Sequence, residues 1–250
     1  MSRRRPGVNW TVDGGVARIT LCRPERGNRI DLDGAQRLCA AVEAIELDDD
    51  VGVVVVAAEG RTFCLGVEDG GDWEGRHDWV AAVGGLTHPV VAAVNGAAVA
   101  AGCELTLACD LRLVSARAVF TLPQIGAGVL PRHGALQRLP RLVGRMRALD
   151  WLLSGRRIGA REAERAGLAT RVVPPARLAA TVRREVGALA AKGPIALRLA
   201  KEAVNKGLDL TLEQGMRLEQ DLYVLLQTTA DRVEGIQAFL SKRRPKFRGR

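Results

Sequence analysis

The stretch Val51–Ala58 constrains the fold more than any other part of this sequence, because it is almost continuously apolar and rich in β-branched residues. A strand with one solvated face alternates apolar and polar residues, whereas a strand covered on both faces does not alternate. Covering both faces of a sheet requires helices, which normally join parallel strands as crossover connections. The stretch therefore predicts an α/β fold with a buried central sheet.

The residues around this strand repeat the β-then-α order. Apolar runs at 8–12 and 16–22 flank Asp13-Gly14-Gly15, which is typical of a hairpin turn. A helix follows, with Asp31 or Asp33 as its N-cap. After the central strand the pattern predicts a helix, a strand, a helix and a strand, at 79–86, 90–94, 103–109 and 111–114.

The second half of the chain is mostly helical. Helices are predicted at 136–143, 146–153 and 160–166, followed by a strand at 169–173. Lys192-Gly193-Pro194 is the best boundary signal, because proline suits the first turn of a helix. We therefore divide the chain into a core of residues 1–192 and a helical unit of residues 193–250. The helical unit should hold three helices, near 195–206, 211–227 and 231–241.

The charge balance favours an anionic partner, since 37 basic residues face 28 acidic ones and the formal net charge is +9. Nucleic acid and the phosphates of coenzyme A are both candidates. Aromatic residues are only 4% of the chain, and no helix-turn-helix or RNA-stacking motif is present, which argues against nucleic acid.

Targeting and metal signals are weak. No apolar stretch reaches the roughly 18–20 residues of a membrane span, and the basic start at Ser2 leads into no apolar signal core. We therefore expect a cytoplasmic protein without a membrane partner. We therefore expect the five cysteines to be reduced and mostly buried. The three histidines lack the spacing of a zinc site. No metal is predicted.

Two segments combine small residues with a lone acid. The first small-residue segment is Phe63-Cys64-Leu65-Gly66-Val67-Glu68, and the second runs from Asn95-Gly96 to Glu104-Leu105. Small residues let a ligand approach the backbone, and the first turn of a helix has N–H groups free to bind an anion. One N–H group from each segment could polarise a carbonyl whose oxygen gains negative charge. The alternative is that these glycines and alanines only allow close packing.

Together the two segments resemble those of the enoyl-CoA hydratase/isomerase (crotonase) family, and the resemblance extends over nearly the whole chain. Three later stretches agree with it in order. They are Phe120–Leu142 with its Gln137-Arg138-Leu139, the stretch Ser154–Leu168, and Glu234–Phe239 with the Lys242-Arg243-Arg244 that follows.

The resemblance implies a fold, an assembly and a site. It implies a spiral of ββα units with a C-terminal helical trimerisation unit, assembled as homotrimers or as hexamers built from two trimers. The implied site has backbone N–H donors at Val67 and Ala101, beside Leu65 and Gly66, and a general acid/base at Glu104. It implies that Tyr223 lines the acyl pocket and that Lys242 reaches the coenzyme phosphates. No cofactor is implied, since coenzyme A is part of the substrate.

This chain departs from the family pattern at two places. Gln124 stands where the family's hydratases have a second glutamate, and glutamine cannot exchange a proton near neutral pH. Arg132 and His133 replace small residues in the turn that follows. Arg132 is either a contact for a substrate carboxylate or phosphate, or a surface charge. His133 is either a substitute proton-transfer group or a solvated loop residue.

The remaining acids and histidines near these segments carry plainer interpretations. Glu68 and Asp69 are expected to be solvated or to cap a helix, and His77 and His88 to be structural.

The function that follows is an acyl-CoA-processing enzyme that stabilises a thioester enolate, with Glu104 as general acid/base. Isomerisation, or another proton shift by one base, fits Gln124 better than hydration by two carboxylates does. The alternative is an acyl-CoA-binding protein of the same fold with lost or altered catalysis.

Overall fold

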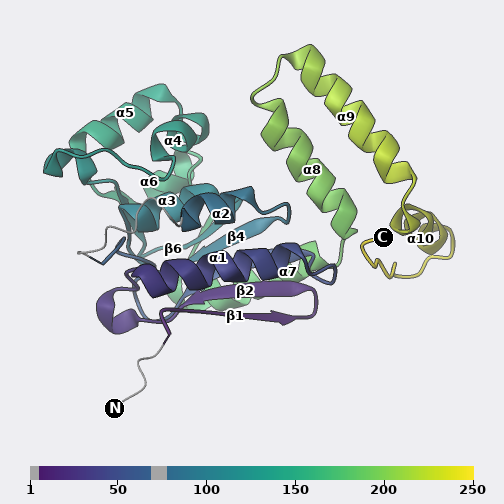
Figure 1. Cartoon of the computed structure of the whole chain (residues 1–250), viewed down its shortest axis with the longest axis horizontal. Coiled ribbons are helices and arrows are strands. Elements are labelled where there is room, and N and C mark those ends of the chain that lie inside the picture. The colour runs from purple at the N-terminus through teal and green to yellow at the C-terminus, as the bar shows by residue number, and fades with distance from the viewer. Residues whose placement is uncertain (1–5, 69–77) are drawn as a thin grey trace.

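The computed structural model describes residues 6–68 and 78–250. Its main sheet has six strands in the order β1-β2-β3-β4-β6-β9 (Figure 1). The hairpin strands β1 and β2 are antiparallel, and every other neighbouring pair is parallel. The strands are β1 (Val8–Asp13), β2 (Val16–Leu21), β3 (Val53–Ala58), β4 (Val90–Val94), β6 (Leu111–Ser115) and β9 (Arg171–Val173). The predicted α/β class is confirmed.

The central strand β3 is covered on both faces, which explains its unbroken apolar sequence. Successive side chains of a strand point to opposite faces. Val54 and Val56 pack in the larger core with the first three helices, whereas Val53 and Val55 pack in a second core against α7. The covering helices are α1 (Leu32–Glu46), α2 (Trp79–Gly85), α3 (Ala101–Ala108) and α7 (Leu178–Ala190).

The helix starts follow local capping chemistry. Asp31, one of the two predicted caps, is the N-cap of α1, and its carboxylate accepts from the Gly34 N–H at 2.9 Å. Asp78 caps α2 in the same manner, accepting from the Ala81 N–H. The predicted helix 103–109 begins two residues earlier than expected, at Ala101, and this places Glu104 in its first turn.

A small second sheet joins parts of the chain that the sequence pattern did not connect. It contains β5 (Ala98–Val99), β7 (Val119–Thr121) and β8 (Ile158–Gly159), in that order. Strands of two or three residues are too short to show a period. Helix α6 (Ala160–Arg165) packs against this sheet, α4 (Ala135–Val143) packs on α3, and α5 (Arg145–Ser154) packs on α4.

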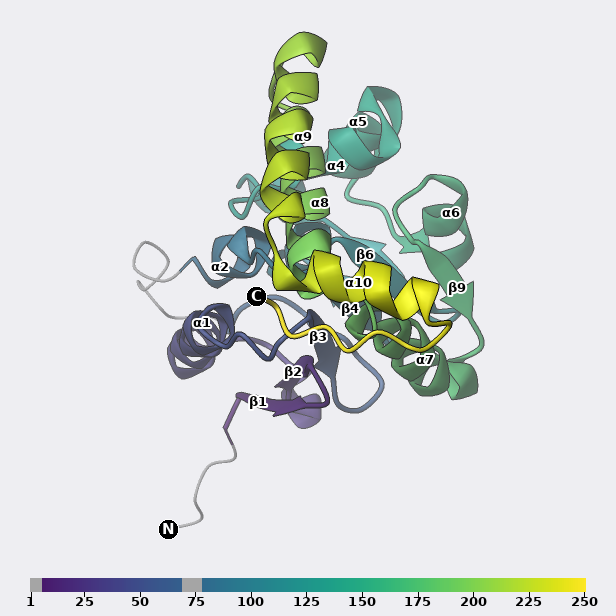
Figure 2. The same ribbon diagram turned by 90° about the vertical axis from the view of Figure 1, so that its right-hand side faces the viewer.

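The C-terminal helices α8 (Pro194–Gly207), α9 (Leu212–Gln227) and α10 (Ala230–Leu240) extend away from the sheet (Figures 1 and 2). Helices α8 and α9 pack against each other, yet neither has a fully buried residue. Large apolar side chains remain exposed on the unit, including Leu212 at 82% and Phe239 at 83%. Helix α7 ends at Ala190 and α8 begins at Pro194, on either side of the predicted boundary.

A polar junction attaches α8 to the core. Lys201 Nζ lies 2.7 Å from the Asp110 carboxylate and donates to the His88 carbonyl at 2.8 Å. His88 is wholly buried and also contacts Arg198. Burial and the charge of Arg198 lower the pKa of His88. This places His88 in the framework, as the sequence predicted. In the described part of the chain, no helix is long and apolar enough to cross a bilayer.

Candidate active site

The two small-residue segments meet directly, although about thirty residues separate them. Cys64 and Ala98 form a parallel bridge, and the Val99 N–H donates to the Cys64 carbonyl at 2.9 Å. The contact requires glycine at position 102, because a Cβ there would lie 2.1 Å from the Cys64 carbonyl oxygen. The packing interpretation of this glycine is therefore correct, and the packing is what brings the two segments together.

The backbone at the meeting point adopts conformations that side chains rarely allow. Gly66 has a φ of 98°. Ala100, the residue before α3, has φ 49° and ψ −124°, a strained conformation for a residue with a Cβ. A Cβ on Gly66 would lie 3.4 Å from the Ala100 Cβ. Strain of this kind persists only where the surrounding structure enforces it, and here the Ala100 N–H is held by the Thr121 carbonyl of β7 at 2.9 Å.

Two backbone donors remain available at this point. Ala101 is the first residue of α3, so its N–H has no partner within the helix. Across residues 6–68 and 78–250, no protein acceptor is bound to the N–H of Ala101 or to that of Val67. The sequence expected one donor from each segment, and these are the two residues it named.

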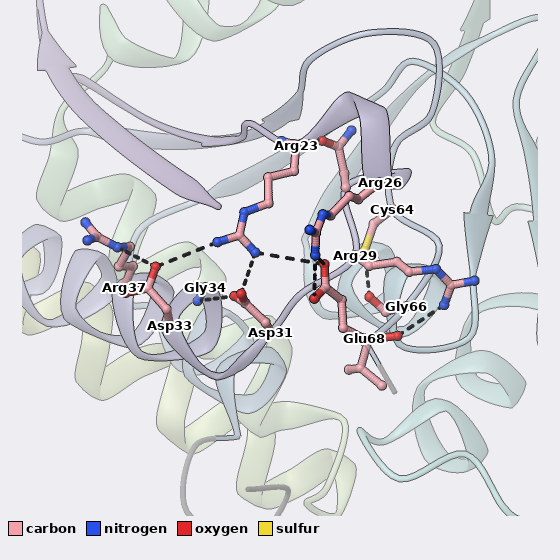
Figure 3. Close-up of polar contacts among 12 residues, drawn as sticks. Arg23, Arg26, Arg29, Asp31, Asp33, Gly34, Arg37, Cys64, Gly66 and Glu68 are labelled. Atoms are coloured by element: carbon pink, nitrogen blue, oxygen red, sulfur yellow. Dashed lines mark hydrogen bonds and ion pairs between the residues drawn. The ribbon is translucent and has the colours of Figure 1, made fainter. Parts of the chain in front are cut away.

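Arginines hold the first small-residue segment from outside (Figure 3). Arg29 donates to the Val67 carbonyl at 3.1 Å, and Arg26 forms an ion pair with Glu68 at 3.1 Å. Glu68 is therefore paired with arginine and neither caps a helix nor stands alone in solvent. Asp69 and His77 lie outside the described residues. The arginine contacts thus hold the carbonyl of Val67 and the carboxylate of Glu68.

Glu104 is a buried acid next to these donors. Its residue exposure is 1%, and its Oε1 accepts from the His133 N–H at 2.9 Å. Burial raises the pKa of Glu104, while hydrogen bonds from the backbone of His133 and Ala135 and the charge of His133 act in the opposite direction. A carboxyl group whose pKa is moved toward neutrality can both accept and return a proton.

Gln124 lies beside Glu104, as the sequence comparison with two-carboxylate enzymes implied. Its Nε2 donates to Glu104 Oε2 at 3.3 Å, from a short 3-10 turn at Gln124–Ala127. Its Oε1 is buried and has no hydrogen-bond partner among the described residues. Such an acceptor costs about 1–3 kcal/mol unless a donor reaches it. Gln124 Oε1 can therefore accept a hydrogen bond from a donor that lies beside the Glu104 carboxyl.

His133 is largely buried rather than standing in solvent. Its side chain is 11% exposed, and its Nδ1 lies 3.1 Å from Asp78 Oδ1. The imidazole also packs on the indole of Trp79, with ring centroids 5.7 Å apart. The loop-residue interpretation of His133 is therefore wrong, because α2 supplies both a carboxylate partner and an aromatic wall.

The assembled site holds a buried acid next to two backbone N–H groups that have no acceptor among the described residues. Comparison with known proteins decides which chemistry such a site belongs to. The family described as enoyl-CoA hydratase/isomerase matches residues 11–250 of this chain. The chain belongs to the enoyl-CoA hydratase/isomerase family. Its predicted spiral fold is confirmed by the same comparison and by the solved structures below.

Several family members cover nearly the full length of this chain. YngF of Bacillus subtilis (strain 168), whose name assigns it to the enoyl-CoA hydratases/isomerases, is 38% identical over 94% of this chain and 95% of its own. The 2,3-dehydroadipyl-CoA hydratase of Escherichia coli (strain K12) is 36% identical over 94% of this chain and 96% of its own. The crystal structure of an enoyl-CoA hydratase from Bacillus anthracis superposes with a TM-score of 0.93 at 34% identity, covering 98% of this chain and all of that one.

The other residues predicted to contact substrate lie in different parts of the structure. Leu65 lies in the first small-residue segment, where its N–H donates to the Gly27 carbonyl at 3.0 Å. Arg132 is exposed on the turn before α4. Its possible contact with a substrate carboxylate stays a prediction.

Tyr223 and Lys242 are not brought near Glu104 within one chain. Tyr223 lies on α9 and is 62% exposed. Lys242 follows α10, is exposed, and has a φ of 50°. Both helices lie on the opposite side of the molecule from α3 (Figure 1). The roles expected for these two residues stay predictions.

The sequence interpretation missed Asp78. The residue precedes a predicted helix, and an aspartate at that position is a recognisable N-cap signal. Its contact with His133 spans 55 residues of sequence, and no local pattern could have revealed it.

Proposed function

We propose that this protein is an acyl-CoA enzyme of the hydratase/isomerase type in which Glu104 is the main general acid/base. The Val67 and Ala101 N–H groups receive the thioester oxygen as it becomes an enolate oxygen. The single observation that carries this proposal is the buried Glu104 carboxyl in the first turn of α3, next to two backbone donors that have no acceptor in the described chain.

The proposal is supported by the position at which negative charge develops during the reaction. Removing or adding a proton at the α-carbon of a thioester places negative charge on the thioester oxygen. Fixed N–H dipoles in a site that excludes water stabilise that charge without reorganising, which is usually the largest single contribution to catalysis. The strained backbone at Ala100 holds one donor in place, and Gly66 permits the close approach of the other segment.

Gln124 takes a positioning role in this proposal. Its Nε2 holds one Glu104 oxygen, and its unpaired Oε1 could accept from a water molecule or from the substrate. Glutamine exchanges no proton, so Glu104 alone can support a proton shift from one carbon to another. Addition of water requires a further proton-transfer group.

The second candidate is an acyl-CoA-binding protein with lost or altered catalysis, and the replacement of a carboxylate by Gln124 favours it. Turnover separates the two candidates. A binding protein would show affinity for enoyl-CoA thioesters and no hydration or isomerisation on a panel of chain lengths.

The deciding experiment is Glu104→Gln, with Glu43→Gln on the exposed surface of α1 as a matched control. We expect turnover to fall by roughly 10²–10⁴, the usual contribution of a positioned acid/base, with thioester affinity nearly unchanged. Exchange of the substrate α-proton with deuterated solvent should fall in parallel. Turnover of Glu104→Gln near that of the starting protein would remove Glu104 from the mechanism.

We also propose that the chain acts as a homotrimer or as two stacked trimers, without a cofactor other than the coenzyme A of its substrate. The exposed apolar residues of α9 and α10 support assembly, because they have no core of their own within one chain. In such an assembly, Tyr223 and Lys242 would serve the site of a neighbouring copy. A single-chain mass in sedimentation at working concentration would contradict this.

A further inference from the structure

The replacement of the second glutamate by Gln124 leaves the site one proton-transfer group short for hydration. A histidine occupies the wall of the same site. The His133 N–H donates to Glu104 Oε1 at 2.9 Å, so the backbone of this residue is anchored directly on the acid. This backbone contact, together with the effect of the His133 charge on the pKa of Glu104, places the two residues side by side.

The imidazole is oriented from outside the site. Asp78 Oδ1 accepts from the Ala81 N–H at 2.9 Å as the N-cap of α2, and the same oxygen lies 3.1 Å from His133 Nδ1. When an imidazole donates its Nδ1 proton to a carboxylate, Nε2 is the nitrogen left to take up a proton and to give it away again. The fully buried Trp79 ring limits rotation of the imidazole from the other side. The Asp78 carboxylate and the Trp79 ring thus both contact the imidazole and limit its position.

Both acidic and basic residues lie around the His133 ring. Glu104 and Asp78 are the acids that face His133 from α3 and α2. From α4, Arg138 donates to the His133 carbonyl at 2.8 Å, and the exposed Arg132 precedes it in the chain. The charge of His133 lowers the pKa of Glu104 and the charge of Asp78 raises it, so the three groups interact electrostatically.

We propose that His133, oriented by Asp78, is the second proton-transfer group of this site, and that it replaces the missing carboxylate in adding water to a 2-enoyl thioester. This rests on the proposed function of Glu104. His133 is assigned to contact the reacting atoms, whereas Asp78 acts through His133 and is a positioning residue.

The proposed step balances without a co-reactant. Water loses a proton to Glu104 while its oxygen bonds to the β-carbon. The π pair of the double bond moves to the thioester, whose oxygen is held by the two backbone donors. The protonated imidazole then gives its Nε2 proton to the α-carbon, which forms the new C–H bond. The Glu104 proton returns to His133 through solvent, and the site is restored.

The test compares His133→Gln and Asp78→Asn with Asp48→Asn, a half-buried control beyond the end of α1 where asparagine can still accept from the Asp50 N–H. Asparagine can still cap α2, so Asp78→Asn removes only the charge that orients the ring. We expect His133→Gln to lower hydration of crotonyl-CoA by roughly 10²-fold or more with little change in KM. Asp78→Asn should lower it about tenfold, and Asp48→Asn should leave it unchanged.

Two readouts separate chemistry from structure. The pH profile of kcat/KM should lose one limb in His133→Gln but not in Asp48→Asn. Imidazole added to the buffer should restore part of the rate to His133→Ala and none to Glu104→Gln. A purely structural histidine would give neither effect.

The outcomes also separate this inference from the proposed function. Hydration by His133→Gln at the rate of the starting protein, while Glu104→Gln is inactive, overturns the role of His133 and leaves that of Glu104. If His133→Gln does not fold, the pH profile of Asp78→Asn and the imidazole rescue of His133→Ala decide. An unaltered profile together with no rescue overturns the proposal.

Discussion

Changing Gln124 to glutamate would place a second carboxylate against Glu104. Gln124 Nε2 lies 3.3 Å from Glu104 Oε2, so the new carboxylate oxygen would begin at a similar distance, with no change in side-chain length. Glu104 is already 1% exposed, and burial raises its pKa. The substitution therefore turns a donor–acceptor contact into contact between two like charges.

The magnitude follows from that distance. Two unit charges about 4 Å apart repel by about 4 kcal/mol at an effective dielectric constant of about 20. This corresponds to roughly a thousandfold change in proton affinity, since about 1.4 kcal/mol is tenfold. The two carboxyls should share one proton over a wide pH range and titrate as a pair.

The sign of the stability effect follows from linkage. A carboxyl whose pKa is higher in the folded chain than in the unfolded chain favours folding most at low pH. That advantage is lost as the pH rises through the folded-state pKa. Relative to the starting protein, Gln124→Glu should therefore be least destabilised near pH 4 and increasingly destabilised above it. If both groups ionise, a cost of about 4 kcal/mol lowers Tm by about 8–16 °C.

The assay is thermal unfolding of both proteins across pH, together with the hydration rate of crotonyl-CoA. We expect the hydration rate to rise only slightly, and only at pH values at which the two carboxyls together hold one proton. The gain is small because Glu104 and the new glutamate compete for that proton. Parallel Tm curves for the two proteins at all pH values would refute the reasoning, since residues 104 and 124 could not then share a site. Rapid hydration by the starting protein, with no increase in Gln124→Glu, would show that glutamine at position 124 does not impair hydration.

Two further predictions concern the contact of the small-residue segments and the basic terminus. Gly102→Ala would place a Cβ 2.1 Å from the Cys64 carbonyl, so a fall in the denaturant midpoint and a loss of activity are expected, whereas Gly187→Ala on α7, where a Cβ meets nothing within 4 Å, should change neither. Lys242→Ala should weaken binding of a CoA thioester, more at low ionic strength than at high, because its proposed role is charge attraction. Equal affinities of Lys242→Ala and the starting protein at both ionic strengths would remove Lys242 from the binding surface.

Most of the main elements could be predicted from sequence because their causes are local. The unbroken apolar run of β3, the two glycines of the first hairpin and the aspartate before α1 each determine structure within a few residues. The family resemblance likewise lies in short stretches that keep their order. Glu104, Gln124 and the donors at Val67 and Ala101 could be named for that reason.

The relations among these residues were decided only by the tertiary structure. The small sheet of β5, β7 and β8 has strands of only two or three residues. These strands pair because the tertiary fold brings their backbones side by side. The Asp78–His133 contact joins a helix cap to a loop 55 residues away. Sequence pattern reports what a residue does to its near neighbours along the chain. A proton-transfer site depends on atoms within about 3 Å of one another in space, and folding alone sets which atoms those are.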